Sequence, residues 1–373
     1  MGRMGRRAVL AALATATAGG LAAASSTGRP TTADRLPRTG QLDPRYEDAE
    51  SVLVAELVER HVPAAALAVA ERGSVVVDRV YGWADPHRET PTEPDALFRI
   101  ASLSKPLTRA AIRQLVRRGA IDYDAAAVDL LAIDSPADAD PRLEQISVRH
   151  LLEHRGGWNR SISGDPLFQA RTVADALGLE RAPTRREFVR YAFGEPLDFA
   201  PGERRAYSNL GYAVLGTIVE DVTGLGYQEF LRSTVLEPSG ATDVRLARSL
   251  PQDRPDREVW YAGGGVCRNA VDPTDPWPVR CPDGGFAVEA MDAHGGHVAT
   301  ARDYLAFATT FWLSGAPAER ATFRSDSMRG HLPGSFAIAL QPSPSIAAVV
   351  LCNRRAAGEG RLTSDLIQAL LAA

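Results

Sequence analysis

Strand-forming segments stand at both ends of the chain, and a long helical stretch separates them. Near the N-terminus, residues 64–70 and 75–81 are typical of two strands, and Arg72 and Gly73 between them favour a hairpin turn. Near the C-terminus, residues 335–340 and 346–352 are also strand-like. A strand needs hydrogen-bonded neighbours, so we expect the two chain ends to share one antiparallel sheet.

Helical patterns account for most of the remaining chain. Apolar spacing predicts a helix over 47–61, ahead of the first strand, and another over 363–371 at the end. Between about 103 and 314, capping residues and glycines mark helices that begin near Leu103, Thr184, Ser208 and Thr300. We therefore predict an α+β fold for residues 43–373, in which terminal helices flank the sheet. The sheet lobe covers about 43–101 and 316–373, and an inserted, mainly helical lobe covers about 102–315.

The first 24 residues have the pattern of a signal peptide. Three arginines precede an apolar run, and small residues that suit cleavage follow at positions 22–24. The pair Arg6 and Arg7 also permits a twin-arginine signal. Because the apolar run is shorter than the about 20 residues that a membrane span needs, we expect no stable membrane span. The sequence predicts a disordered lead-in over 25–42 and a secreted, periplasmic or cell-envelope location.

The net charge indicates which class of partner the protein can bind, and the cysteines bear on the redox state of its compartment. The formal net charge of −4 offers no basic surface for nucleic acid, so we expect a small-molecule or peptide substrate and a monomer. In an oxidising compartment Cys267 and Cys281 could close a short loop. Cys352 lies in an apolar run and is expected to be buried and inert.

Lys105 is the single lysine of the chain, among 42 basic residues. Arginine stays protonated at any ordinary pH, whereas burial can bring a lysine amine to neutrality. Ser102 precedes Lys105 by three residues at the start of a predicted helix, so the hydroxyl and the amine share one face. Backbone N–H groups at a helix start also stabilise a developing oxyanion. This spacing is typical of a nucleophile with its activating base.

A second polar motif, Tyr207-Ser208-Asn209, stands directly before another predicted helix. A phenol and a carboxamide at the same turn can serve as a proton shuttle and as a donor to a substrate amide. Taken alone, Tyr207 could pack against the core and Asn209 could cap the helix. Together with the solitary lysine, the motif favours catalysis.

At these motifs the sequence resembles the serine β-lactamase and penicillin-binding superfamily, in particular its class C β-lactamase and esterase-like branch. The similar stretches, within about 45–372, are 98–108, 148–157, 201–216, 295–307 and 332–334 with the strand to Asn353. The resemblance implies that Ser102 attacks a carbonyl and that Lys105 and Tyr207 handle its proton. It further implies that Asn209 positions substrate or lysine, and that water releases the acyl group. The expected function is an exported serine hydrolase acting on a small ester or amide.

The third motif of that superfamily is altered in this chain. Its usual Lys or His followed by any residue and Gly falls on Met328, Arg329 and Gly330. Met328 cannot bind a carboxylate, and Arg329 substitutes for the missing cation if its strand twists. Gly330 and His331 are assigned to substrate binding, because the backbone N–H of His331 is the expected second oxyanion donor beside that of Ser102.

Other interpretations of the same residues stay open at this point. Loss of the third-motif cation permits a non-catalytic binding protein, and S-x-S-K also occurs at pyridoxal-phosphate lysines. We expect neither a cofactor nor a metal, because His294 and His297 flank glycines of a family turn. His154 is expected to fix the turn over 151–157 rather than to take part in catalysis.

Overall fold

A computed structural model describes residues 36–133, 138–316, 323–355 and 359–373. The predicted signal peptide, 1–24, and residues 25–35 of the lead-in lie outside the described residues. The central feature is a sheet of antiparallel strands in the order β1-β3-β2-β11-β10-β9. Their bounds are β1 Arg38–Leu42, β2 Ala64–Glu71, β3 Ser74–Gly82, β9 Asp326–Leu332, β10 Ser335–Ser343 and β11 Ile346–Cys352.

The two ends of the chain meet where β2 pairs with β11 in the middle of this sheet. Ala68 lies opposite Val349, and Ala66 lies opposite Leu351. The predicted hairpin is present as β2 and β3, and the predicted C-terminal pair is present as β10 and β11. The α+β class and the sheet shared by both chain ends are therefore confirmed.

Strand β1 corrects the prediction of a disordered lead-in reaching residue 42. Its residues pair antiparallel with β3, with Arg38 opposite Tyr81 and Leu42 opposite Val77. The segment reads Arg-Thr-Gly-Gln-Leu, a polar pattern that gives no strand signal by itself. The neighbouring strand supplies backbone hydrogen bonds to this edge, and such tertiary pairing overrides local propensity.

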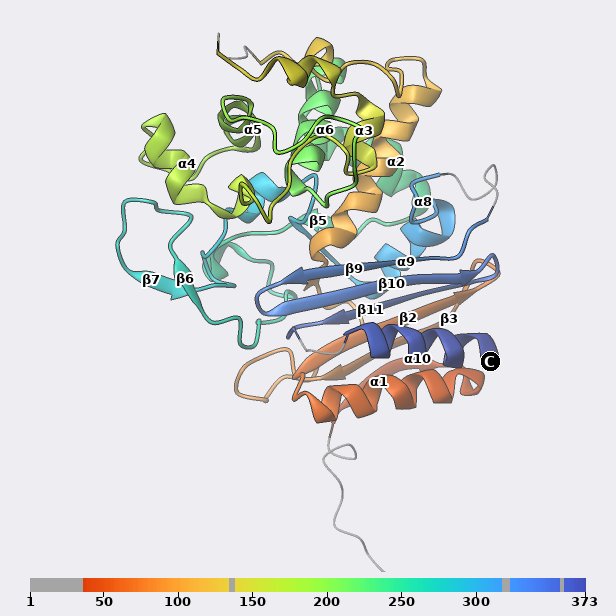
Figure 1. Cartoon of the computed structure of the whole chain (residues 1–373). Helices are drawn as coiled ribbons and strands as arrows, with labels where there is room; N and C mark the ends of the chain where they lie inside the picture. The colour runs from red at the N-terminus through yellow and green to blue at the C-terminus, as the bar shows by residue number, and fades with distance from the viewer. Residues whose placement is uncertain (1–35, 134–137, 317–322, 356–358) are drawn as a thin grey trace, which may run out of the picture.

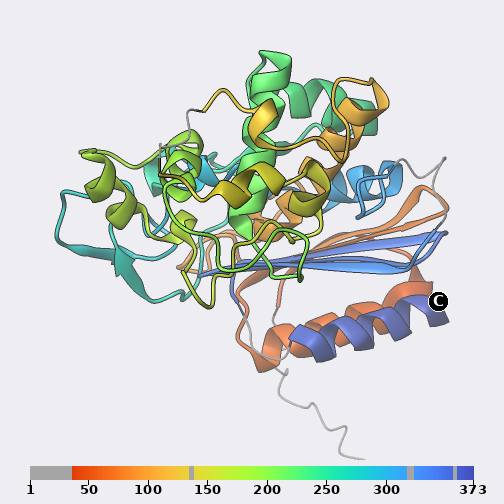
Figure 2. The ribbon, with the colours of Figure 1, turned by 45° about the horizontal axis from the view of Figure 1, so that its top comes forward.

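Helices cover both faces of the sheet (Figures 1 and 2). Helices α1 (Glu47–Glu59) and α10 (Glu359–Ala372) lie side by side on one face. On the other face, α9 (Ala301–Thr310) packs against β2 and β11, and α2 (Ser104–Arg117) rises from the sheet into the helical lobe. Along β2, alternate residues enter two separate apolar cores, and the strand is buried for nearly its whole length. Burial on both faces explains why the strand reads as a continuous apolar run.

The helical lobe holds further helices, whose bounds are α3 Val148–Leu152, α4 Ala170–Leu177, α5 Arg185–Phe193, α6 Asn209–Thr223, α7 Tyr227–Leu231 and α8 Glu237–Ser239. The capping box predicted at Thr184 and Glu187 is present at the start of α5. Ser208 caps α6 by accepting from the backbone N–H of Gly211, and Gly224 ends the helix in a left-handed conformation. Helix α6 packs against α2, so the two helices that begin at the sequence motifs are neighbours.

Two small sheets in the described chain have strands that sequence reasoning did not predict. One has the order β4-β8-β5, with bounds β4 Phe98–Arg99, β8 His297–Ala299 and β5 Val244–Leu246. The other pairs β6 Val266–Arg268 with β7 Pro278–Arg280. Strands this short carry too few residues for an alternating pattern to be detected. The first sheet matters for function because β4 leads directly to Ser102.

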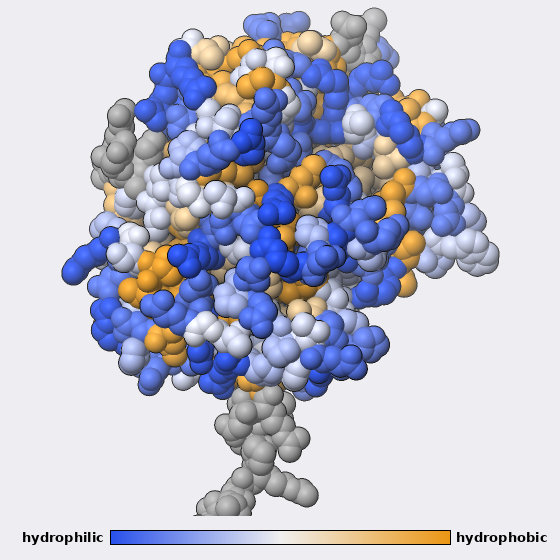
Figure 3. All heavy atoms as spheres, turned by 180° about the vertical axis from the view of Figure 1, so that it is seen from behind, coloured by the Kyte–Doolittle hydropathy of each residue, from blue (hydrophilic) through white to orange (hydrophobic). Residues whose placement is uncertain are grey.

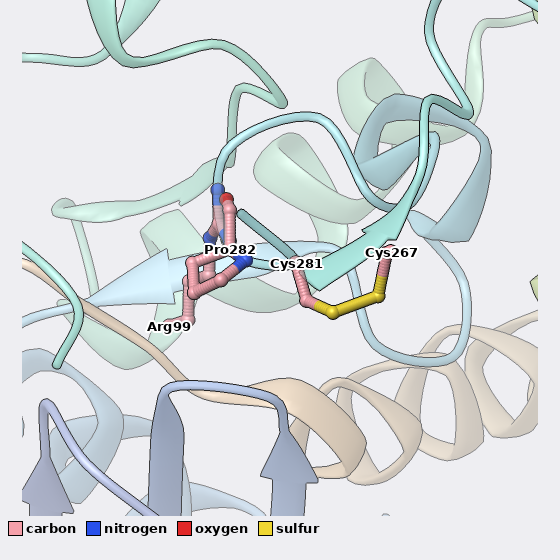
Figure 4. The surroundings of a disulfide bond; sticks show 4 residues. All are labelled: Arg99, Cys267, Cys281 and Pro282. Atoms are coloured by element: carbon pink, nitrogen blue, oxygen red, sulfur yellow. A yellow bond between two sulfur atoms is a disulfide. The ribbon is translucent and has the colours of Figure 1, made fainter. Parts of the chain in front are cut away.

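A disulfide joins Cys267 and Cys281 in the loop that holds β6 and β7 (Figure 4). Beside it, the Arg99 guanidinium donates to the backbone oxygen of Pro282 at 2.7 Å. Arg99 is fully buried and lies three residues before Ser102. The disulfide loop is thus tied to the strand that leads to the serine. Cys352 is buried and unpaired, as the sequence predicts.

The face of the molecule seen in Figure 3 is mainly hydrophilic, and its apolar residues form small groups that hydrophilic residues separate. An extended apolar patch is therefore absent from this face. Among the described residues, no helix has both the length and the apolar character needed to cross a bilayer.

Candidate active site

Ser102 lies in a 3-10 turn, Ala101–Leu103, that runs into α2. The residue before it, Ala101, has φ of 46°, a left-handed conformation that is unfavourable for alanine. The surrounding structure must hold this conformation, as is common at functional sites. Lys105 is the second residue of α2, and its Nζ lies 3.3 Å from Ser102 Oγ. The predicted meeting of hydroxyl and amine is thus present.

The amine of Lys105 is completely buried. It donates to Asn209 Oδ1 at 2.7 Å and to the backbone oxygen of His294 at 2.8 Å. Burial holds its pKa well below the ordinary value for lysine, and the positive charges of Arg109 and Arg160 act in the same direction. A neutral amine has two N–H bonds and one lone pair. The two carbonyl oxygens accept those N–H bonds, which leaves the lone pair for the hydroxyl of Ser102.

The phenol of Tyr207 also reaches Ser102, with its Oη 2.7 Å from Ser102 Oγ, and the Lys105 amine lies 4.8 Å from the centroid of the Tyr207 ring. Burial raises the pKa of this phenol, although the hydrogen bond with Ser102 and the charge of Arg160 oppose the rise. The phenol is therefore neutral near pH 7 and retains a proton to donate. Burial acts in opposite directions on the two groups: it favours a neutral base at Lys105 and a neutral acid at Tyr207.

The imidazole ring of His154 packs against the ring of Tyr207. The two rings stack with centroids 4.6 Å apart, and His154 Nδ1 accepts from the backbone N–H of Ser208 at 3.2 Å. Its backbone is left-handed, with φ of 60°, and its backbone oxygen accepts from the N–H of Ala206. Burial lowers the pKa of His154 to about 3, so the ring is neutral at physiological pH. These contacts hold the segment 206–208, which carries Tyr207, whereas the sequence predicts a role in the turn over 151–157.

Asn209, the first residue of α6, connects Lys105 to a carboxylate that sequence reasoning missed. Its Oδ1 accepts from Lys105, and its Nδ2 donates to Asp165 Oδ2 at 2.7 Å. Asp165 comes from the loop before the short 3-10 turn Pro166–Phe168, and its side chain caps this turn by accepting from the backbone N–H of Leu167. In the sequence, Asp before Pro indicates only a residue that caps a turn. The hydrogen bond between Asp165 and Asn209 has no sequence signal.

Gly330 brings strand β9 against the serine. A Cβ at this position would lie 2.2 Å from the backbone oxygen of Ile100 and 3.0 Å from the backbone nitrogen of Ser102. Glycine is therefore required by close approach, independently of its φ. The next residue, His331, lines the same cleft as Ser102. Gly330 and His331, which the sequence assigns to substrate binding together with Asn209, therefore lie near Ser102.

Replacing Gly330 with alanine is expected to lower activity about 10²-fold, because the added methyl pushes β9 away from Ser102. The overpacking should also lower the free energy of unfolding by about 1–3 kcal/mol. Gly226→Ala is a matched control, since Gly226 has φ of −60° and open space at its Cβ. Equal kinetics and melting temperatures for the two variants would contradict the close approach.

Strand β9 places Met328 and Arg329 of the third motif on opposite faces of the sheet. Met328 and Gly330 lie opposite Ala339 and Ala337, which belong to the core on the side of the helical lobe. Arg329 lies opposite Ile338, a residue of the core under α1 and α10. Successive side chains of a strand point to opposite faces, so Arg329 is directed away from the catalytic side. Its guanidinium lies near Gly360 at the start of α10, although the residue also lines the cleft that holds Ser102.

A different arginine stands beside the catalytic groups. The Arg160 guanidinium lies 5.1 Å from the centroid of the Tyr207 ring, and the residue lines the cleft. It comes from the loop after His154, which carries no motif that would single it out. In this chain, therefore, the positive charge near the phenol comes from the helical lobe, and Met328 presents an apolar group on the strand.

These groups line one open cleft of about 630 Å³. Ser102, Tyr207 and Asn209 form its reactive part, whereas Lys105 lies beneath them, out of reach of solvent. The other lining residues include Arg160, Phe168, Met291, His294, Met328, Arg329, His331, Leu332 and Pro333. The cleft has room for a small ester or amide and for part of a peptide.

The histidines that resemble a metal cluster in the sequence have other contacts. Asp292 forms an ion pair with Arg185, and His297 Nε2 lies 3.2 Å from Gln228. His294 uses its backbone oxygen to hold Lys105. Among the residues that the structure describes, no three His, Cys, Asp or Glu side chains are grouped to hold a metal ion.

Comparison with known proteins agrees with this geometry. Esterase EstB of Burkholderia gladioli is 32% identical over 254 residues, which cover 67% of this chain and 60% of the esterase. Penicillin-binding protein 4* of Bacillus subtilis (strain 168) is 29% identical over 57% of this chain and 44% of its own length. The chain therefore matches less than two thirds of the length of either relative. The solved structure of D-amino acid amidase from Ochrobactrum anthropi SV3 with D-phenylalanine shares the fold, at a TM-score of 0.67 and 22% identity, over 88% of this chain and 99% of that one.

The family model described as Beta-lactamase matches residues 50–344, a range that includes every residue placed in the site above. The resemblance inferred from the motifs around Ser102 and Tyr207 is thereby confirmed: the chain belongs to the beta-lactamase family.

Proposed function

We propose that this protein is a serine hydrolase that forms an acyl-enzyme on Ser102. The observation that carries the proposal is the position of Ser102 Oγ, 3.3 Å from the amine of Lys105 and 2.7 Å from the phenol of Tyr207. A nucleophile between a neutral base and a neutral acid is the arrangement that acyl transfer requires. Family membership counts against the pyridoxal-phosphate interpretation of Lys105.

Acylation follows from the protonation states that burial favours. Ser102 Oγ attacks the substrate carbonyl carbon while its proton passes to the lone pair of Lys105. The carbonyl oxygen becomes an oxyanion, for which the backbone N–H groups of Ser102 and His331 are the proposed donors. Tyr207 donates its proton to the leaving alcohol or amine as the bond to carbon breaks, and Lys105 returns a proton to the phenol. Water then attacks the acyl-enzyme, and the same groups transfer its protons.

The proposed substrates are small esters or amides that lack a carboxylate, including amides of D-amino acids. Support comes from the apolar Met328 on the strand that would otherwise offer a cation to a substrate carboxylate. The names of the relatives, an esterase and a D-amino acid amidase, point to the same bond types.

A panel of p-nitrophenyl esters, D- and L-amino acid amides and a cephalosporin tests the substrate proposal, with Ser102→Ala as control. We expect multiple turnover on an ester or a D-amide, slow or no turnover of the cephalosporin, and no turnover by the variant. Ligands that raise the melting temperature without any product would instead support the alternative, a non-catalytic binding protein.

Export forms part of the proposal. It is supported by the signal-like pattern of residues 1–24 and by the Cys267–Cys281 disulfide, since disulfides persist in oxidising compartments. N-terminal sequencing of protein recovered outside the cytoplasm should show cleavage near Ala24. A full-length chain retained in the cytoplasm would overturn it.

We also propose that the protein is a monomer, which size-exclusion chromatography with light scattering tests. An octamer is the contrasting outcome, because an octameric penicillin-binding protein homologue from Pyrococcus abyssi shares the fold, with a TM-score of 0.61.

A further inference from the structure

Asp165 stands at the end of a hydrogen-bonded chain that leads to the catalytic base. Its Oδ2 accepts from Asn209 Nδ2 at 2.7 Å, and Asn209 Oδ1 accepts from Lys105 Nζ at 2.7 Å. Its other oxygen accepts from the backbone N–H of Leu167 at 3.2 Å. Asp165 lines a neighbouring pocket rather than the cleft that holds Ser102.

The carboxylate decides which end of the Asn209 amide faces the lysine. An amide side chain can occupy the same space in two orientations, with either its oxygen or its NH₂ group toward a neighbour. An ionised carboxylate only accepts hydrogen bonds, so it draws the NH₂ group of Asn209 to itself. The amide oxygen is then directed at Lys105. In the opposite orientation, the NH₂ group would compete with the Ser102 hydroxyl for the lone pair of the amine.

The charge of Asp165 has a second, measurable effect. Burial is the main cause that lowers the pKa of Lys105, and the negative charge of Asp165 opposes it. Burial also raises the pKa of Asp165, while hydrogen bonds from Asn209 and Leu167 oppose that rise. Removing the charge should therefore lower the pKa of Lys105 further, so that its amine stays neutral to a lower pH.

We propose that Asp165 is a positioning residue for acylation: through Asn209 it orients the amine of Lys105 so that the lone pair faces Ser102. This inference rests on the proposed function, because it assumes that Lys105 is the base. It predicts an unusual combination for a variant that lacks the carboxylate. Maximal acylation should slow because orientation is lost, and the acid limb of the pH profile should move to lower pH because the charge is lost.

The test measures the rate at which a fluorophosphonate probe labels Ser102 between about pH 4 and pH 9. For Asp165→Asn we expect a maximal labelling rate about tenfold or more below wild type. We also expect an acid limb displaced downward by about half to one pH unit. Asp165→Glu keeps the charge and should leave the limb in place. Asp165→Ala carries the same expectation as Asp165→Asn if the asparagine variant does not fold.

Asp198→Asn is the matched control. The Asp198 carboxylate holds the same loop, accepting from the backbone N–H of Asn159 and from Ser163 Oγ, and it has no contact with Asn209. It should leave the acid limb unchanged, whatever it does to stability or KM.

Two results would overturn the inference. One is an Asp165→Asn variant whose acid limb and maximal labelling rate are the same as those of wild type. The other is an Asp198→Asn variant whose acid limb moves as far as that of Asp165→Asn. The proposed function fails separately, through absence of labelling in wild type.

Discussion

Replacing Lys105 with arginine is expected to lower the rate of Ser102 acylation by about 10³-fold or more, within the range of about 10²–10⁴ for loss of a general base. The change keeps a cation, so ordinary reasoning about charge would class it as conservative. The lysine amine is buried and its pKa is held well below its ordinary value. Guanidinium stays protonated at every usable pH and has no lone pair for the serine proton. Single-turnover labelling of Ser102 measures the loss.

The pH profile of wild type gives an independent check on the same residue. A protonated Lys105 cannot accept the serine proton, so acylation is lost as pH falls through its lowered pKa. Because burial places that pKa well below the ordinary lysine range, activity should persist at pH values where a solvent-exposed lysine is fully protonated. On the alkaline side, loss of the Tyr207 proton should begin above the ordinary tyrosine range, since burial raises its pKa.

Controls separate chemistry from folding in this experiment. Lys105→Met removes the base without adding a larger charged group and should give the same loss. Arg113→Lys makes a comparable exchange on the same helix, where the guanidinium contacts Ser314 and Tyr123 rather than the site. Wild-type acylation by folded Lys105→Arg would refute the role of a neutral amine.

Removing the hydroxyl of Tyr207 by substitution with phenylalanine should lower turnover by about 10²–10⁴-fold. The Oη lies 2.7 Å from Ser102 Oγ, so it is the proton donor nearest to the leaving group as the bond to carbon breaks. The loss should be greater for amides than for p-nitrophenyl esters, because an amine leaves as a much stronger base than nitrophenolate. Steady-state kinetics on a matched amide and ester measure the difference.

The phenylalanine variant should otherwise be conservative. The ring still stacks on His154 and still lies near Arg160, so the melting temperature should change little. Tyr191→Phe is the control, because Tyr191 lines the neighbouring pocket rather than the catalytic cleft. An equal loss on ester and amide would argue that Tyr207 positions Ser102 instead of donating a proton.

The fold could be predicted where one element carries its own pattern. Strands β2 and β11 are apolar over seven residues and β3 and β10 contain shorter apolar runs, and α5 and α6 begin at clear caps, so sequence located them well. Strand β1 could not be predicted, because its polar residues form a strand by pairing with β3. The same holds for β4, β5 and β8, whose two or three residues are organised by their neighbours.

The site was predictable where residue type and spacing carry the chemistry. The single lysine at Lys105, three residues from Ser102, identified a base and a nucleophile, and the motif at Tyr207 supplied their partner. Asp165 and Arg160 could not be found this way, because they reach the site from a long loop whose path depends on tertiary packing. The orientation of Arg329 was also inaccessible, since it depends on which face of β9 packs against the helical lobe.

Labelling of the intact, folded protein by a fluorophosphonate, followed by peptide mass spectrometry, tests the central claim most directly. The account predicts one covalent adduct, on Ser102, that forms in wild type, disappears in Ser102→Ala and is strongly reduced in Lys105→Arg. Folded wild-type protein that carries no adduct on Ser102, or that is labelled instead at another serine, would contradict it.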